Sequence, residues 1–521
     1  MWGFALEGTT AVPVRVEAHV RPGLPGMTIV GLPGVAVREA RERVRSGAGS
    51  SGMPLPARRM TVNLSPGDLR KEGPGLDLPV ALAVLAASDH LPASALAGVA
   101  AHGEVALDGV IRPVRGVLSV AEAAGSMGVR MLFIPLTALP EAAEVGGTEV
   151  VGVRSLAEAV VAVRDSGVRE RLGRRGRIWM LRRARTKPCA TADAAGPDLC
   201  EVAGHGHVKR ALEVAAVGGH HLLMVGSPGS GKTMLARRVP TILPPLTRGE
   251  ALEVTRVWSV AGLRSPDAGL VVDRPFRAPH HSASRVALVG GGPVPRPGEV
   301  SLAHHGVLFL DELPEFSRDS VEALRQPLEE SVVHISRRSG MCTFPARCTL
   351  VAAMNPCPCG FLGHPDRPCR CTAESQARYR HVLSGPLVDR IDLTVEVPPL
   401  TSSALDESTG GEPSGVVQAR VVAARKFRAG REDWWMQATA GSSGGGNAHP
   451  AALEKRWRLS AEGRRLLREA LVRHSLGGRG YVRVLSVART LADIDAYDTI
   501  RSAHVAEALA FRVSGAERWS L

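Results

Sequence analysis

The sequence contains no apolar run long enough to cross a membrane. Among its 521 residues, one of the longest apolar stretches is 78–87, which is far shorter than the ~20 residues of a transmembrane helix. The first residues carry no basic segment followed by an apolar core, so we expect no secretion signal. Only 8 residues are cysteine, too few for a disulfide-built scaffold. These absences predict a cytoplasmic protein with no membrane partner, long enough for about three domains.

Positive charge is concentrated in one segment. The formal net charge is +13, and residues 169–187 hold nine basic side chains against one acid, Glu170. The nine are Arg169, Arg171, Arg174, Arg175, Arg177, Arg182, Arg183, Arg185 and Lys187. Lys and Arg clusters favour nucleic-acid binding because they displace counterions from phosphates. A solvated linker or a general arginine bias would give the same composition.

The most specific motif is a glycine-rich loop that follows the apolar run 222–225. It consists of Gly226, Ser227, Pro228, Gly229, Ser230, Gly231, Lys232 and Thr233. A buried strand that leads through such a loop into a helix lets backbone N–H groups surround phosphate oxygens. We predict that Lys232 reaches the β- and γ-phosphates of ATP and that Thr233 coordinates Mg²⁺.

A second motif indicates hydrolysis. The apolar run 307–310 ends in Asp311 and Glu312, and ligands of open α/β sheets bind at the carboxyl ends of strands. We predict that Asp311 holds the Mg²⁺ shell and that Glu312 polarises the attacking water. An isolated Asp-Glu pair is more often a solvated helix start, but the preceding strand makes that alternative weaker. The two motifs together predict an ATPase.

Composition divides the chain into four parts. Residues 1–167 contain short strand-like runs, glycine-rich turns and alanine-rich helical stretches, as expected of an α+β domain. A basic linker follows over 168–200. From 201 to 400, strands alternate with helices around the two motifs, which predicts a parallel sheet covered by helices. Residues 401–521 hold polar and glycine-rich stretches and then apolar residues at helical spacing, which predict a helical lid.

Over nearly its whole length the chain resembles the magnesium-chelatase-like AAA+ proteins, most closely the ComM/YifB group. The resemblance rests on residues 277–282, 290–292, 296–299, 306–316, 355–360 and 384–392. It implies an AAA+ parallel-sheet core with a helical lid and a hexameric, ATP-driven DNA motor. In this group such a motor is a branch-migration helicase that promotes integration of single-stranded DNA during natural transformation. The alternatives are a magnesium-chelatase motor subunit and an ATP-dependent chaperone that remodels proteins.

The resemblance also implies roles for three further residues. Asn355 ends an apolar run and corresponds to the sensor-1 residue beside the γ-phosphate. Arg390 corresponds to an arginine finger that completes the ATP site of a neighbouring subunit; a structural ion pair with Asp389 or Asp392 is the alternative. Arg479 resembles the sensor-2 arginine of the lid, with Arg483 as the rival assignment.

Two local patterns predict binding of other partners. Residues 332–344 resemble the hairpin that faces the ring pore in related helicases, and we expect its Arg337 and Arg338 to contact the DNA backbone. An ordinary exposed hairpin is the alternative.

The cysteines come in two close pairs, namely Cys357 with Cys359 and Cys369 with Cys371. Four thiolates satisfy a tetrahedral Zn²⁺, although one residue inside each pair is fewer than the usual two to four, and reduced loop cysteines are the alternative.

The first domain resembles the Lon-type protease domain at residues 70–77 and 103–109. In Lon proteases a serine nucleophile follows the Gly-Pro pair, and a lysine partner lies in a later helix. Gly75 and Val120 occupy those positions in this sequence. Because the Ser–Lys mechanism needs both a hydroxyl and an amine, we expect no protease activity. We expect this domain to keep its fold for subunit assembly or for contact with DNA.

Overall fold

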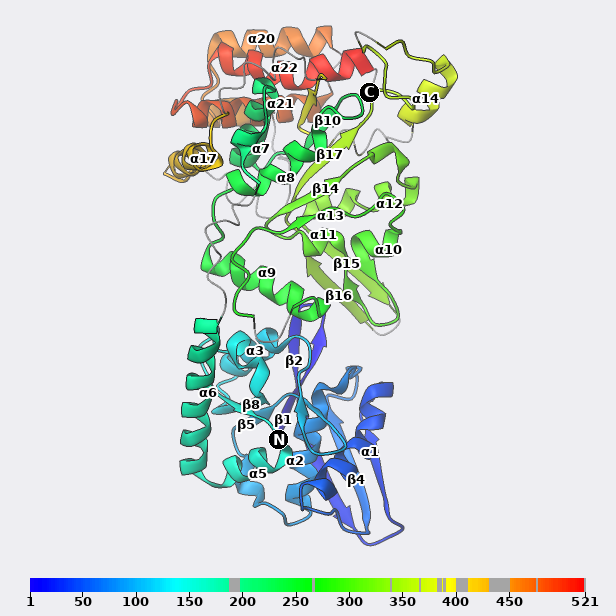
Figure 1. Cartoon of the computed structure of the whole chain (residues 1–521), viewed down its shortest axis with the longest axis vertical. Coiled ribbons are helices and arrows are strands. Elements are labelled where there is room, and N and C mark those ends of the chain that lie inside the picture. The colour runs from blue at the N-terminus through cyan, green and yellow to red at the C-terminus, as the bar shows by residue number, and fades with distance from the viewer. Residues whose placement is uncertain are drawn as a thin grey trace.

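The computed structural model describes residues 1–186, 197–264, 268–337, 340–364, 367–381, 387, 390–399, 411–430, 450–474 and 477–519. Figure 1 shows an elongated molecule with three successive parts. The N-terminal domain lies at one end, the domain with the glycine-rich loop and the Asp311–Glu312 pair lies in the middle, and the C-terminal helices lie at the other end. No helix among these described residues is apolar over a length that would span a bilayer.

A seven-stranded mixed sheet forms the N-terminal domain, in the order β3-β4-β2-β1-β5-β8-β9. Its strands are β1 (Trp2–Glu7), β2 (Thr10–Arg21), β3 (Gly26–Val30), β4 (Arg59–Ser65), β5 (Val99–Ala101), β8 (Met131–Pro135) and β9 (Glu149–Val153). In β4, every second residue is buried (Met60, Val62, Leu64), as expected of a strand with one face on a core. A short pair, β6 (Glu104–Val105) and β7 (Ile111–Arg112), lies beside the sheet.

The helices of this domain are α1 (Val35–Ser50), α2 (Asp77–Ala87), α3 (Val117–Ser126), α4 (Leu139–Ala142), α5 (Leu156–Arg164) and α6 (Ser166–Thr186). Helix α2 is apolar on all sides and is buried from Asp77 to Leu85, which is typical of a central helix. Helix α6 packs on β9 and α5, and its Arg175 forms two hydrogen bonds with Glu158, of 2.8 and 2.9 Å. The basic segment predicted as a linker therefore begins as a helix of the N-terminal domain.

A five-stranded parallel sheet in the order β11-β14-β17-β10-β18 forms the middle domain. Its strands are β10 (Leu222–Val225), β11 (Phe276–Arg277), β14 (Val307–Leu310), β17 (Thr349–Met354) and β18 (Leu393–Glu396). The helices are α7 (Gly206–Gly218), α8 (Lys232–Ile242), α9 (Arg248–Ala261), α10 (Arg285–Val289), α11 (Glu299–Leu302), α12 (Arg318–Glu322), α13 (Arg325–Glu330) and α14 (Ala373–His381). Two hairpins project from it, β12 (Gly290–Gly291) with β13 (Arg296–Pro297) and β15 (Val332–Arg337) with β16 (Gly340–Pro345). The predicted α/β class and parallel core are confirmed.

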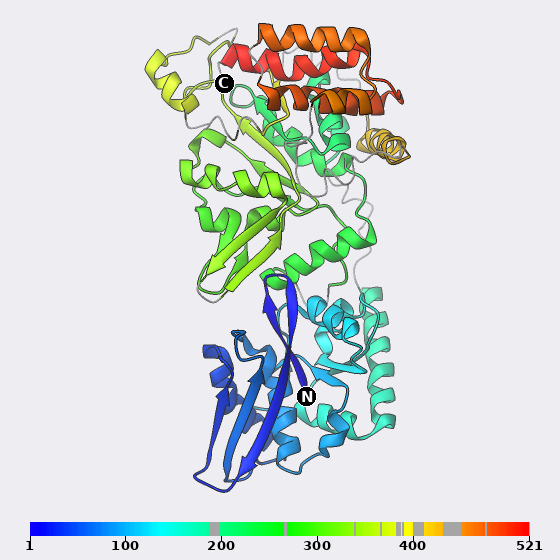
Figure 2. The same cartoon turned by 180° about the vertical axis from the view of Figure 1, so that it is seen from behind.

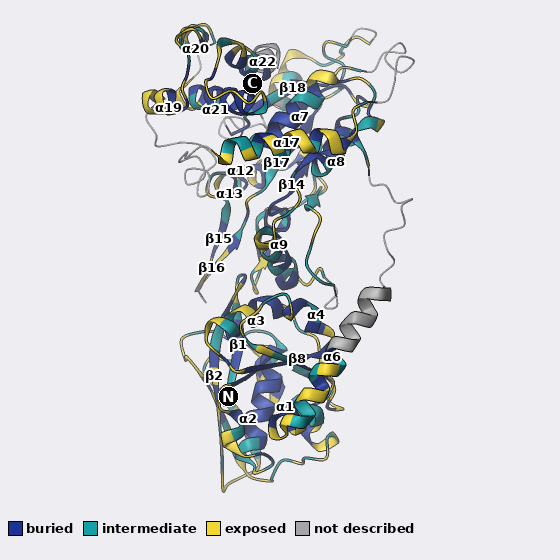
Figure 3. Ribbon diagram, turned by 90° about the vertical axis from the view of Figure 1, so that its left-hand side faces the viewer, coloured by how far each residue is buried: buried dark blue, intermediate teal, exposed yellow. Residues whose placement is uncertain are grey.

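Strands β10 and β14 are fully buried along their length, because helices cover both faces of the sheet (Figure 3). A strand covered on both faces must be apolar throughout, which explains why both motifs follow unbroken apolar runs.

Among the described residues after the sheet, the helices are α17 (Ser414–Ala429), α19 (Pro450–Arg456), α20 (Ala461–Arg473), α21 (Gly478–Ile494) and α22 (Ser502–Trp519). Helix α21 packs on α7, and α22 packs on β18. Leu485 and Val505 from these helices share one hydrophobic cluster with Leu212 and Val395 of the middle domain. The C-terminal helices and the sheet therefore form a single packed unit.

The N-terminal and middle domains meet along α3 and α9 (Figure 1). At the same junction the β1–β2 turn reaches the β15–β16 hairpin (Figure 2), where Gly8 lies against the Thr343 backbone. A Cβ on Gly8 would lie 2.5 Å from Thr343 O. Glycine is therefore required there, both for space and for its φ of +61°.

Candidate active site

The glycine-rich loop lies at the carboxyl end of β10 and leads directly into α8. Gly226 N donates to Met354 O of the neighbouring strand at 3.2 Å, which fixes the loop against the sheet. Gly231 is the N-cap of α8 and has a φ of +90°, which favours glycine. The free N–H groups at the start of the helix therefore face the loop, as an anion-binding site requires.

The ammonium group of Lys232 lies inside this loop. Its Nζ donates to Gly226 O at 2.7 Å, to Ser227 O at 2.8 Å and to Asn355 Oδ1 at 3.3 Å. Burial lowers the pKa of Lys232, and the nearby carboxylates Asp311 and Glu312 oppose that shift. The loop carbonyls thus hold a buried cation beside the free N–H groups, where it can bind phosphate.

Thr233, in the first turn of α8, meets Asp311, which directly follows β14. The Thr233 hydroxyl donates to Asp311 Oδ2 at 2.6 Å, while Asp311 Oδ1 accepts the backbone N–H of Glu312 at 3.0 Å. Hydroxyl and carboxylate oxygens are the ligands that Mg²⁺ prefers. The Ser230 hydroxyl is buried in the same loop and has no hydrogen-bond partner among the described residues. Hard oxygen ligands, a lysine and an unsatisfied donor all fit Mg²⁺ and a triphosphate.

Glu312 has a left-handed backbone conformation at the end of β14, with φ 52° and ψ 47°. Its side chain is half-exposed, and its Oε2 lies 3.3 Å from His281 Nδ1. His281 belongs to the loop after β11, and sequence analysis gave this histidine no role. The sequence signal that could have indicated His281 is the run 277–282, which was used only as part of the family resemblance.

Arg390 lies away from this group. Residues Leu222 and Leu393 pair at the starts of β10 and β18, so Arg390 precedes the amino-terminal edge of the sheet. A four-residue strand spans about 13 Å, which separates Arg390 from the glycine-rich loop of its own chain. Its side chain is 3% exposed and forms an ion pair with Glu329. Sequence analysis proposed an aspartate as the alternative partner, but the partner found is Glu329.

The two lid arginines lie near Arg390. Burial, followed by the charges of Arg325, Arg479 and Arg483, lowers the pKa of Arg390 to about 10. Arg479 is exposed at the start of α21. Arg483 donates to Arg390 O at 2.6 Å and pairs with Asp392. Asp392, the predicted alternative partner of Arg390, is therefore held by Arg483, and Asp389 lies outside the described residues.

The predicted basic hairpin is present as β15 and β16, which pair from Val332 with Pro345 to Arg337 with Gly340. Arg337 is the last residue of β15, and its side chain lies outside the described part of the chain. Arg338 lies outside the described residues altogether.

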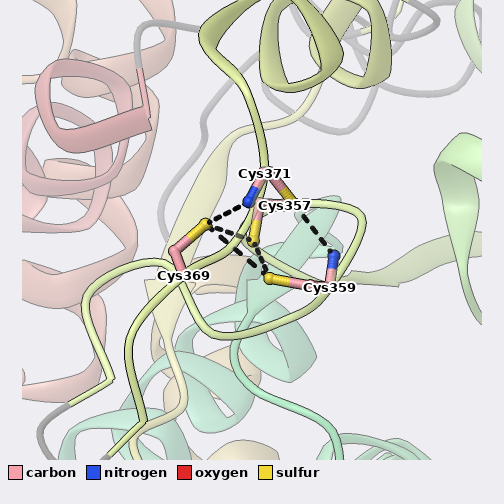
Figure 4. A group of neighbouring side chains, drawn as sticks. All are labelled: Cys357, Cys359, Cys369 and Cys371. Atoms are coloured by element: carbon pink, nitrogen blue, oxygen red, sulfur yellow. Dashed lines mark hydrogen bonds between the residues drawn. The ribbon is translucent and has the colours of Figure 1, made fainter.

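The four predicted cysteines converge on one point (Figure 4). The Sγ of Cys357 lies 3.4 Å from that of Cys359 and 3.6 Å from that of Cys369, and the last two lie 3.7 Å apart. All four Sγ atoms, including that of Cys371, lie within 4.8 Å of one another. These distances exceed a disulfide bond and are close to the ~3.8 Å edge of a tetrahedron with Zn–S bonds of about 2.3 Å.

Backbone N–H groups point at these sulfurs. Cys359 N donates to Cys371 Sγ, and Cys371 N donates to Cys369 Sγ, both at 3.4 Å. Gln376 Nε2 also donates to Cys369 Sγ, at 3.5 Å, as the third N–H donor to the sulfur cluster. Such donors favour thiolates and orient metal ligands. The donor set therefore fits a soft divalent cation such as Zn²⁺.

A second group of potential ligands, Glu253, His304 and His305, fits hydrogen bonding better than a metal. Glu253 Oε2 lies 3.0 Å from His304 Nε2 and 2.8 Å from His305 Nε2. His304 Nδ1 accepts the Arg347 N–H at 3.0 Å, so a neutral His304 carries its proton on Nε2 and donates it to Glu253. His305 has a φ of +57°, a conformation that asparagine and histidine tolerate best after glycine.

In the N-terminal domain, the His102 ring occupies the space in front of Gly75. A Cβ on Gly75 would overlap the Cε1 atom of His102. Burial lowers the pKa of His102 to about 4, so the ring is neutral near pH 7. The position that corresponds to the Lon nucleophile therefore has no room for a serine side chain.

Comparison with known proteins matches most of the chain to one family. The model for magnesium chelatase, subunit ChlI, matches residues 198–405, that for subunit ChlI of Mg-chelatase matches 16–138, and that for the ChlI C-terminal region matches 411–512. The chain is 42% identical to the YifB protein of Salmonella typhimurium, over 97% of its own length and 95% of that protein. This chain belongs to the ComM/YifB family of magnesium-chelatase-like proteins.

Two further relatives bear on function. The competence protein ComM of Haemophilus influenzae is 41% identical, over 97% of this chain and 95% of ComM. The DNA helicase MCM8 of Bos taurus is 27% identical over 30% of this chain and 19% of its own length. Together with the parallel sheet, these relatives establish an AAA+ ATPase fold for this ComM/YifB protein.

Proposed function

We propose that this ComM/YifB protein is an ATPase that drives movement along DNA as a hexameric ring, and that it serves recombination of incoming single strands. The convergence of Lys232, Thr233, Asp311 and Asn355 at one edge of the sheet carries the ATPase part of the proposal. Lys232 and Thr233 begin α8, Asp311 follows β14, and Asn355 follows β17, and their side chains meet through hydrogen bonds. An unrelated structural role gives no reason for a lysine, a hydroxyl, a carboxylate and an amide to meet beside a helix N-terminus.

In this proposal each side chain has a defined task. Lys232 leaves the loop carbonyls to bind the β- and γ-phosphates, and Thr233 and Asp311 would hold Mg²⁺, which neutralises charge on the phosphates. Glu312 orients the attacking water and accepts its proton, while His281, 3.3 Å from its carboxylate, limits the positions that Glu312 can adopt. Asn355 fixes the γ-phosphate side of the site through its contact with Lys232.

The arginines support an oligomer. Arg390 and Arg479 lie at the amino-terminal edge of the sheet, opposite the phosphate loop of the same chain. An arginine that stabilises the transferred phosphoryl group must contact it, so these arginines can act only on the ATP of a neighbouring subunit. We therefore propose that Arg390 is the arginine finger, that Arg479 is its sensor-2 partner, and that the active form is a hexamer.

The proposal of DNA as the partner rests on the β15–β16 hairpin, the net charge of +13 and the two DNA-related relatives. Basic residues at a hairpin tip bind phosphates without regard to base sequence. We also propose that the four cysteines hold Zn²⁺, on the evidence of their sulfur geometry and N–H donors.

Steady-state ATP hydrolysis, measured with and without single-stranded and branched DNA, tests this proposal. We expect strong stimulation by DNA and loss of hydrolysis in Glu312→Gln, which keeps the size of the side chain but removes its charge. Nucleotide binding should survive that substitution. Hydrolysis that DNA does not change would contradict the DNA motor and favour a motor that acts on a protein or chelatase-type partner.

A further inference from the structure

The cysteine centre lies directly beside the proposed ATP site. Cys357 follows Asn355 with only Pro356 between them, so the first sulfur is attached to the loop that carries the sensor-1 amide. The centre is thus continuous with β17, whose last residue, Met354, accepts the Gly226 N–H of the phosphate loop.

The first cysteine arm also packs on the phosphate loop. Gly360 N donates to Cys357 O at 2.9 Å and closes a tight turn. A Cβ on Gly360 would overlap the Cδ atom of Pro228 and would lie 3.8 Å from Asn355 Cγ. Gly360 has a φ of +81°, so both its conformation and its neighbours require glycine. The turn that holds Cys357 and Cys359 therefore rests against both sides of the phosphate pocket.

The second cysteine arm reaches the same residue, Asn355, from another direction. Cys371 leads into α14 (Ala373–His381), and Tyr379 of this helix interacts with the Asn355 backbone. Tyr379 also packs against the hydrophobic cluster that contains Met354. Asn355 is therefore held between two arms, and the sulfur cluster is where those arms meet.

We propose that a Zn²⁺ ion bound by Cys357, Cys359, Cys369 and Cys371 positions Asn355 and the phosphate loop for hydrolysis. The four cysteines are then positioning residues, since none of them touches the nucleotide. The inference rests on the proposed ATPase function and deepens it, because it assigns a metal to the chain and a role in turnover to that metal. Misplacement of a reacting group by about 1 Å costs up to ~100-fold in rate, so loss of the ion lowers kcat more than nucleotide affinity.

The first test uses the full chain purified without chelators. We expect about one zinc ion per chain by elemental analysis, in the wild type and in Cys200→Ser. Cys200 lies outside the cluster and is the matched control for loss of a thiol. Cys371→Ser should lose most of the metal. Replacement of zinc by Co²⁺ should give the sulfur-to-cobalt charge-transfer absorption of a four-thiolate site. Wild-type protein with no bound metal would refute the site.

The second test measures kcat and nucleotide affinity on the same proteins. We expect kcat to fall about 10- to 100-fold in Cys371→Ser, with nucleotide affinity nearly unchanged. Combining Cys371→Ser with Asn355→Ala should lower kcat no further than Asn355→Ala alone, because both act through the same amide. Gly360→Ala should keep the zinc and still lower kcat.

Two outcomes would overturn the inference without touching the ATPase proposal. One is a metal-free Cys371→Ser that hydrolyses ATP at the wild-type rate. The other is full additivity with Asn355→Ala. If Cys371→Ser does not fold, the same test uses wild-type protein from which zinc is removed and then added back in steps. In that case kcat must rise in proportion to the zinc content. Zinc-loaded wild type without any hydrolysis would instead contradict the proposed function.

Discussion

The junction between the N-terminal and middle domains depends on a buried hydrogen-bond network that a single substitution can break. Ser259 of α9 donates from Oγ to Glu141 Oε1 at 2.5 Å and accepts the Gly116 N–H at 3.0 Å. The same Glu141 oxygen accepts the Leu118 N–H at 3.0 Å. Gly116 is the N-cap of α3, so a residue of the middle domain caps a helix of the N-terminal domain.

Replacement of Ser259 by Ala leaves the Gly116 N–H without its partner and removes a donor to the Glu141 carboxylate. An unsatisfied buried donor costs about 1–3 kcal/mol, which corresponds to a change of about 5- to 150-fold in an equilibrium constant. Both side chains are buried, Ser259 and Glu141 being 6% exposed. We therefore expect the domain junction to open about 5- to 150-fold more often in Ser259→Ala.

Hydrogen exchange measures this opening directly. Amides at the start of α3 should exchange about 5- to 150-fold faster in Ser259→Ala, while β10 and β17 keep their protection. Glu141→Gln is the matched comparison, because an amide oxygen can accept both hydrogen bonds without carrying charge. Unchanged exchange at α3 in Ser259→Ala would refute the argument that this network holds the two domains together.

The pH dependence of the same network has a defined sign. Burial raises the pKa of Glu141 above its ordinary value of 4.5. The folded state therefore binds this proton more tightly than the unfolded state, and stability falls as pH rises through the interval above 4.5. Glu141→Gln should remove that component of the pH dependence in thermal unfolding measurements. A variant that follows the wild-type pH profile would show that Glu141 does not cause it.

Three further predictions follow from other contacts. Gly8→Val should force the β1–β2 turn away from Thr343. We expect this to weaken the stimulation of ATP hydrolysis by DNA while basal ATP hydrolysis stays near the wild-type value. Equal loss of basal and DNA-stimulated hydrolysis would contradict the expectation that this contact affects only the β15–β16 hairpin. Gly75→Ser should lower the free energy of unfolding by about 1–3 kcal/mol through overpacking against His102, as measured by chemical denaturation, and it should yield no peptidase activity. Hydrogen bonds from two histidines lower the pKa of Glu253 far below its ordinary value of 4.5, so its contribution to stability is complete above about pH 4.5 and is lost gradually as pH falls below 4.5 toward the folded pKa. The stability advantage over Glu253→Gln should therefore shrink progressively in acid; an advantage that stays constant or grows as pH falls from 4.5 would refute this assignment.

The ATP motifs were predictable because their chemistry is local in sequence. A strand, a glycine-rich turn and a helix start occupy consecutive residues, so 222–233 defines the loop without knowledge of the rest of the fold. Asp311 was equally accessible, since it directly follows a buried strand. The contact of Thr233 with Asp311 followed once both were placed at carboxyl ends of one parallel sheet.

Other features were not accessible because they join residues far apart in the chain. Nothing near Arg390 in the sequence indicates Glu329 as its partner, and nothing near Ser259 indicates Glu141. The basic segment after residue 168 was also ambiguous, because its arginines suit a solvated linker and an exposed helix face equally well. The packing of α6 on β9 shows that this segment begins as a helix of the N-terminal domain. The apolar contact that holds it there is not evident from its charged composition.

The two edges of the parallel sheet explain why one subunit is incomplete for the proposed reaction. The carboxyl ends gather the lysine, the proposed magnesium ligands and Asn355, whereas the amino ends gather Arg390, Arg479 and Arg483. Glu329 and Asp392 pair there with Arg390 and Arg483, while burial, followed by the neighbouring arginines, lowers the pKa of Arg390. A triphosphate presented by a neighbouring subunit would supply the additional negative charge that this edge lacks. Under the proposed hexamer we therefore expect nucleotide to promote assembly, and the packing of α21 on α7 and of α22 on β18 would transmit that contact to the rest of the subunit.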